Sequence, residues 1–337
     1  AASDVYKRQA WDAVKEANHP RIHVFLATSD IHMEYKLKMT REQVIDRIRE
    51  MVAYAKSYCD DIEFSAEDAS RSDWAFLAHC YSTAVAAGAT TLNVPDTVGY
   101  STPQEMYDLI TYLRENIEGV EHVDISVHCH NDLGMATANS LAGVLGGAAQ
   151  IECTVNGLGE RAGNTAMEEV VMAIKMHGEE LDAHTDINTR EFIRASRLVS
   201  SITGFVVQPN KSIVGANAFA HSSGIHQDGV IKERTTYEII DPTEVGAGQS
   251  SIVLSARSGR AALRHRLEAL GYHIEGQEFE DLHTAFLDLA DKKKEVYDED
   301  LESLVGEQGR TQEASYTLKS VQISCGQPLT PTATVTL

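Results

Sequence analysis

The chain has 337 residues, 43% of them hydrophobic and 23% charged, which is the ordinary balance of a globular protein. Its formal net charge of −21 argues against a nucleic-acid partner, because phosphate binding needs a basic face. No apolar stretch approaches membrane-span length and no signal peptide opens the chain, so we expect no membrane partner. The five scattered cysteines predict reduced thiols and a cytoplasmic location.

Residues 1–9 look unrelated to the rest of the chain, and we interpret them as non-native sequence left by cloning or assembly. Alternating strand and helix patterns then occupy residues 10–184. The predicted strands are Arg21–Thr28, Asp61–Ala66, Ala89–Val94, Val123–Val127 and Ala149–Val155. The predicted helices are Thr40–Tyr58, Ser72–Ala87, Thr102–Asn116, Asp132–Gly146 and Ala166–Met176.

About five βα units of this kind indicate an α/β fold with a parallel sheet. A (βα)8 TIM barrel is the natural candidate, because functional-looking residues follow every strand. A doubly wound open sheet gives the same alternation. Five units are too few for a closed barrel, so either the sheet is open or the chain holds only the C-terminal part of a barrel. The abrupt start of the chain favours the partial barrel.

The pattern changes after about residue 182. Helices are predicted at Thr185–Ser201, Gly259–Leu270 and Glu278–Lys293, around a Gly-, Ser- and Ala-rich stretch at Gly215–Gly229. We therefore predict helical linker or lid subdomains over residues 185–312. A strand-like alternation of side-chain types returns near the end of the chain. Residues 313–337 are therefore predicted to begin a further, truncated domain that contains β-strands.

The most informative stretch is the strand that ends in His128, Cys129 and His130. Residues two apart in a strand share a face, so the two imidazoles point the same way. Two histidines at the C-terminal end of a strand form half of a divalent-metal site. The bare motif fits equally well the alternative of two histidines on a solvent-exposed face of the sheet.

Five segments in order resemble the 2-isopropylmalate synthase family, within the DRE-TIM metallolyase superfamily. They are Ile62–Asp68, Leu92–Gly99, Ile125–Ala138, Val155–Asn164 and Ala218–Gly229. The family's arginine-aspartate-glycine motif on the first barrel strand, which supplies one more metal ligand, is not in this sequence. In the family, the last domain is regulatory.

The resemblance implies a divalent metal, Mn²⁺, Mg²⁺ or Zn²⁺, bound by His128, His130 and Asn164. It also implies that His23, Ser65 and Thr97 contact a 2-oxoacid substrate. His226 is the candidate general base, and Glu67 the group that orients or tunes it. His226 lies among small residues that suit a lid, which a dimer partner can supply in the family, so a homodimer is expected.

The implied reaction condenses acetyl-CoA with 3-methyl-2-oxobutanoate to 2-isopropylmalate, the first committed step of leucine biosynthesis. A citramalate or homocitrate synthase, which differs in its 2-oxoacid pocket, is one alternative. A metal-binding but inactive fragment is another, because the first-strand aspartate is missing.

Overall fold

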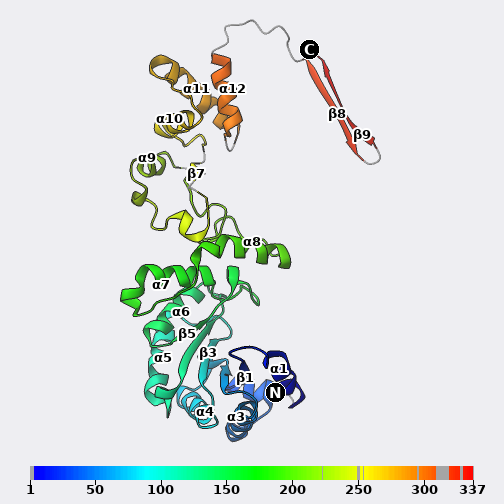
Figure 1. Cartoon of the computed structure of the whole chain (residues 1–337), viewed down its shortest axis with the longest axis vertical. Coiled ribbons are helices and arrows are strands. Elements are labelled where there is room, and N and C mark those ends of the chain that lie inside the picture. Colours follow the sequence, from blue (N-terminus) through cyan, green and yellow to red (C-terminus); the bar gives the residue numbers. More distant parts are fainter. Residues whose placement is uncertain are drawn as a thin grey trace. The chain divides into compact units, whose positions relative to one another are not determined.

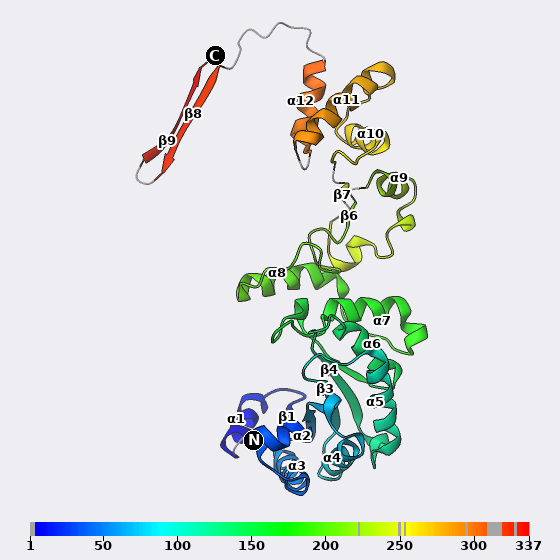
Figure 2. The same cartoon turned by 180° about the vertical axis from the view of Figure 1, so that it is seen from behind.

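The computed structural model describes residues 4–221, 223–248, 251–252, 254–293, 296–308, 319–326 and 329–336. The chain forms two compact units, Ala1–Ala218 with Asp241–Gln249, and Phe219–Ile240 with Ser250–Leu337 (Figures 1 and 2). Helix α1 (Asp4–Val14) runs across the predicted boundary at residue 9. The boundary at residue 312 lies outside the described residues. All the predicted domain boundaries therefore stay predictions.

A five-stranded parallel sheet forms the centre of the first unit, with its strands in sequential order β1-β2-β3-β4-β5. The strands are β1 (Arg21–Ala27), β2 (Asp61–Glu67), β3 (Thr91–Asp96), β4 (Asp124–Cys129) and β5 (Gln150–Glu152). All five predicted strands are confirmed. A doubly wound sheet would reverse its strand order at a switch point, whereas sequential order is that of a barrel wall.

Helices follow the strands and cover one face of the sheet (Figure 1). The helices of this unit that follow β1 are α2 (Asp30–His32), α3 (Arg41–Lys56), α4 (Trp74–Ala86), α5 (Pro103–Asn116), α6 (Ala136–Leu145), α7 (Met167–Leu181) and α8 (Phe192–Thr203). Thr40 and Gln43 form a capping box at the start of α3. The helix buries an apolar stripe that consists of Val44, Ile45, Ile48, Met51, Val52 and Ala55.

The start of α6 was predicted too early. The helix begins at Ala136 rather than at Asp132, because residues 131–134 form a turn in which Gly134 takes a left-handed φ of 73°. The Ala136 amide donates to Asn131 Oδ1 at 3.1 Å, so Asn131 still satisfies one free N–H at the helix start.

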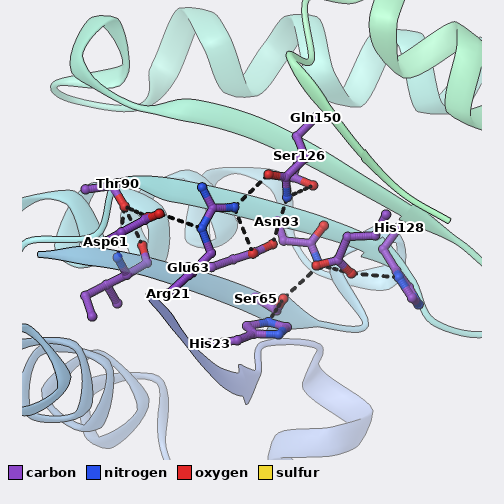
Figure 3. A network of polar contacts seen from close by, with 12 residues as sticks. Arg21, His23, Asp61, Glu63, Ser65, Thr90, Asn93, Ser126, His128 and Gln150 are labelled. Carbon is purple, nitrogen blue, oxygen red and sulfur yellow. Dashed lines mark hydrogen bonds and ion pairs between the residues drawn. The ribbon is translucent and has the colours of Figure 1, made fainter. Parts of the chain in front are cut away.

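The sheet is strongly curled. Arg21 Nη1 on β1 donates to Gln150 Oε1 on β5 at 2.7 Å (Figure 3). In a flat sheet, four strand spacings would separate these strands by about 19 Å, since neighbouring strands lie about 4.8 Å apart. Two side chains could not bridge that distance with so short a contact. The curvature, the sequential order and the one-sided helix layer together confirm the partial barrel.

The second unit is mainly helical, as predicted. Its helices are α9 (Gly224–Lys232), α10 (Arg260–Ala269), α11 (Gly276–Lys292) and α12 (Asp298–Gln308). A separate core joins α10, α11 and α12 through side chains that include Leu263, Phe279 and Leu301. Its strands are β6 (Ala220–His221), β7 (Ser251–Ile252), β8 (Ser320–Gly326) and β9 (Leu329–Thr336), and the last two form an antiparallel hairpin. No helix among the described residues has the length and apolar character needed to cross a membrane.

Candidate active site

His128 and His130 lie at the carboxyl end of β4 and approach each other through their rings. Their Nε2 atoms are 3.0 Å apart, and the ring centroids are separated by 5.0 Å. The other ring nitrogen of His128, Nδ1, lies 2.8 Å from Glu152 Oε2 on β5. Because side chains alternate along β4, both imidazoles lie on the face of the sheet that the helices do not cover, here called the inner face. Val127 and Cys129 point the other way and are buried under the helices.

A cavity of about 200 Å³ lies in front of this pair on the inner face of the sheet. It gathers six of the predicted site residues from successive strand ends. They are His23, Ser65, Glu67, Thr97, His128 and His130. His23 Nε2 lies 2.6 Å from Ser65 Oγ, whereas Glu67 pairs with Lys36 at 2.5 Å.

The backbone of Asn164 lies next to that of His130, but Asn164 does not line the cavity in front of the histidine pair. An isolated antiparallel bridge joins His130 and Asn164. The side chain lines a neighbouring cavity of about 350 Å³ formed by the Gly-rich loop after β5 and residues 199–211. Its buried Oδ1 has no hydrogen-bond partner in the described structure. An acceptor of this kind is available to a cation.

A polar network crosses the inner face behind the histidines (Figure 3). Arg21 binds both Asp61 and Glu63, and Asn93 donates to Ser65 and to Glu152. Burial and a hydrogen bond with Glu152 raise the pKa of Glu63 to about 8. Burial alone would also raise the pKa of Glu152, but hydrogen bonds with His128 and Glu63 lower it to about 2. The two carboxyl groups therefore share one proton near neutral pH.

This shared proton predicts how stability depends on pH. The folded chain keeps a proton on Glu63 between the ordinary carboxyl pKa and about pH 8, whereas the unfolded chain releases it. The free energy of unfolding therefore falls as pH rises through this window. Glu63→Gln imitates the protonated group and should remove most of that fall, roughly 2–4 kcal/mol, since one pKa unit corresponds to about 1.4 kcal/mol.

Urea unfolding followed by circular dichroism at pH 5 and pH 8, with a chelator present, measures the effect. The exposed Glu115 on α5 gives the matched control, and Glu115→Gln should keep the wild-type pH dependence. An equal loss of stability from pH 5 to pH 8 in wild type and Glu63→Gln would contradict the shared proton.

Three further residues belong to the site although the sequence did not predict them there. They are Glu63, Glu152 and Arg161. Inward alternation along β5 (Gln150, Glu152) would have found Glu152. Arg161 pairs with Glu160 at 3.4 Å but more closely with Asp132, whose Oδ1 lies 2.9 Å from Arg161 Nε. A spatial contact between two loops leaves no such signal in the sequence.

His23, Glu63 and Glu152 form a second set of potential ligands. Among the described residues, their ligand atoms lie within 4.8 Å of one another. Two members of this set, Glu63 and Glu152, are the carboxyl groups that share a proton. The set is an alternative to the His128 and His130 pair as a cation site. The inner face therefore offers two candidate ligand sets for a metal.

His226 lies on α9 in the second unit, where it is exposed. Its ring packs against the ring of Tyr237, with a centroid separation of 4.3 Å and an angle of 35° between the ring planes. A Cβ at Gly229 would lie 2.5 Å from Tyr237 Cε2, so glycine permits this close packing. Gly229, one of the small residues around His226, thus serves the packing of the segment itself.

Two family models match the chain. The model described as HMGL-like matches residues 5–199, and the model described as homocitrate synthase post-HMGL domain-like matches residues 213–294. Among solved structures, hydroxymethylglutaryl-CoA lyase from Pseudomonas aeruginosa aligns with a TM-score of 0.51 at 20% identity. The alignment covers 59% of this chain and 68% of that one, and it supports the barrel fold.

Two curated relatives are much closer in sequence. The 2-isopropylmalate synthase of Olsenella uli is 58% identical over 97% of this chain, and that of Pelotomaculum thermopropionicum is 54% identical over 98%. The chain spans 64% and 65% of the lengths of these two relatives. The resemblance inferred from the five segments is confirmed, and the chain belongs to the HMGL-like family.

Proposed function

We propose that the chain is the catalytic part of a 2-isopropylmalate synthase, an acyltransferase that condenses acetyl-CoA with 3-methyl-2-oxobutanoate. The observation that carries the proposal is the histidine pair at the end of β4, in a chain 58% identical to a relative of that name. The names of the relatives favour this reaction over the citramalate and homocitrate alternatives.

The residues present fit a divalent metal. Two nitrogens that each lie about 2.1 Å from one ion, at an angle near 90°, are about 3 Å apart. The observed separation of 3.0 Å between His128 Nε2 and His130 Nε2 matches that geometry. Burial lowers the pKa of His130 and so favours the neutral form of the imidazole, which is the form that binds metals.

We assign Asn164 as a third ligand, since its Oδ1 has no other partner in the described structure. Mn²⁺, Mg²⁺ and Zn²⁺ all suit a mixed nitrogen and oxygen set. When bound, the ion would polarise the ketone of the 2-oxoacid as a Lewis acid.

His23, Ser65 and Thr97 suit the binding of the 2-oxoacid, because all three line the cavity beside the histidine pair. The short His23–Ser65 contact gives this wall a hydroxyl and a ring nitrogen that can bind carboxylate or ketone oxygens. We assign His226 as the base that removes a proton from the acetyl methyl group. Glu67, which lines the cavity and pairs with Lys36, is the assigned orienting group.

The family resemblance also supports two assignments about the whole protein. We infer a homodimer, in which the lid carrying His226 is supplied by a partner, and a cytoplasmic location.

The test compares this chain with a hybrid protein. The hybrid adds to this chain those parts of the Olsenella uli relative that the chain does not cover. We expect the hybrid to release CoA from acetyl-CoA when 3-methyl-2-oxobutanoate and Mn²⁺ are present, and to stop when EDTA removes the metal. Mass spectrometry should identify 2-isopropylmalate. Faster turnover of pyruvate or 2-oxoglutarate would contradict the assigned substrate, and full activity in EDTA would contradict the metal. No turnover in a folded hybrid would favour the inactive fragment.

A further inference from the structure

Arg161 holds together the ends of two strands. It lies in the Gly-rich loop after β5 with a left-handed φ of 53°. Its Nη2 atom lies 2.6 Å from His130 Nδ1, 2.8 Å from the Thr97 carbonyl and 2.9 Å from Asp132 Oδ2. Its Nε donates to Asp132 Oδ1 at 2.9 Å. One guanidinium thus joins the ends of β3 and β4 to the loop that carries Asn164.

The direction of these hydrogen bonds is fixed, because a guanidinium can only donate. Nη2 has two N–H bonds for its three neighbours, so one of these bonds is shared, and His130 Nδ1 at 2.6 Å can only accept from it. A neutral His130 then carries its proton on Nε2. That N–H faces His128 Nε2 at 3.0 Å, which accepts it. His128 then carries its own proton on Nδ1, an atom that lies 2.8 Å from Glu152 Oε2.

This arrangement leaves His130 no lone pair for a metal. Nδ1 accepts from Arg161, and Nε2 carries the proton. An imidazole that binds an ion through Nε2 has its proton on Nδ1, and an N–H at that atom would face another donor, the Arg161 guanidinium. Arg161 and a metal therefore compete for His130.

We propose that Arg161 is a latch on His130 that opposes metal binding, an inference that rests on the proposed role of His130 as a ligand. A metal bound at Nε2 would require the His130 proton on Nδ1 instead, with no net release of a proton from that ring. The guanidinium would then leave His130 and keep its contacts with Asp132 and Thr97. Arg161 is thus a positioning residue, which sets when the histidine pair can accept an ion.

Removing the latch should tighten metal binding. For Arg161→Met we expect the affinity for Zn²⁺ to rise about tenfold to a hundredfold, the usual effect of losing a competing hydrogen bond to a charged group. Competition with a coloured chelator measures this on the whole chain. The matched control is Arg71→Met, since Arg71 Nε pairs with Asp68 Oδ1 at 2.9 Å and its loss removes the same charge. The control should bind Zn²⁺ as the wild type does.

A second measurement detects the tautomer directly. In chain labelled with ¹⁵N-histidine and kept in chelator, the ring-nitrogen shifts of His130 should show the proton on Nε2. Arg161→Met should shift the population toward Nδ1. If Arg161→Met does not give the wild-type circular dichroism spectrum, Arg161→Gln replaces it, since its amide oxygen can accept from Nδ1–H.

The outcomes separate the latch from the proposed function. Equal Zn²⁺ affinities for wild type and variant, or a wild-type His130 protonated on Nδ1, would overturn the latch and leave the metal site standing. An absence of Zn²⁺ binding in all variants would overturn both. Tighter binding together with the tautomer change supports the latch, whether or not the hybrid enzyme turns over its substrates.

Discussion

Replacing His128 by alanine is expected to lower the affinity of the chain for Mn²⁺ or Zn²⁺ by at least about a hundredfold. An imidazole supplies a metal–nitrogen bond of about 2.1 Å, and a ligand set reduced by one such bond holds the ion much less tightly. His130→Ala should have an effect of the same size, because its Nε2 lies 3.0 Å from that of His128. Titration of the metal against a competing chelator measures both.

The exposed His79 on α4 offers the control, and His79→Ala should leave metal binding unchanged. The second ligand set on the inner face gives the contrary outcome. If His128→Ala keeps its metal while Glu63→Gln loses it, the ion lies among His23, Glu63 and Glu152. The His128 and His130 assignment would then be wrong.

Local signals predicted most of the elements of the barrel wall. The capping boxes at Thr40 and Thr102 mark the starts of α3 and α5, where each threonine accepts from the third amide of its helix. Helix α6 was placed too early, because Asn131 accepts from an amide five residues ahead, across a turn. Cap residues identify a helix start by type, whereas the length of the intervening turn depends on its tertiary contacts.

Strand order was the main feature of the fold that local patterns left open. Alternation of strands and helices occurs equally in barrels and open sheets. The deciding contact, between Arg21 and Gln150, joins residues 129 positions apart. A pairing of that range depends on the curvature of the whole sheet.

In the candidate site, too, some residues could be predicted from local sequence patterns and others could not. The spacing of His128 and His130 was enough to place both rings on one face, since strand periodicity is strictly local. Glu152 and Arg161 come from the next strand and its loop, and they reach the histidines only because β5 pairs with β4. Their effects on protonation and tautomer follow from these contacts and could not be read from residue spacing.

The general base is the second assignment with a large expected effect. His226→Ala, made in the hybrid with the Olsenella uli relative, should lower kcat by about 10²–10⁴-fold, the usual loss when a general base is removed. The exposed ring packs against Tyr237, which limits its orientations without burying it. Metal content and binding of 3-methyl-2-oxobutanoate should stay near the hybrid's own values, because His226 is assigned to the acetyl group alone. His273→Ala, at another exposed histidine of the second unit, is the control and should keep full turnover. Turnover of His226→Ala within a few-fold of the hybrid would exclude it as the base, and loss of the metal would place it among the ligands instead.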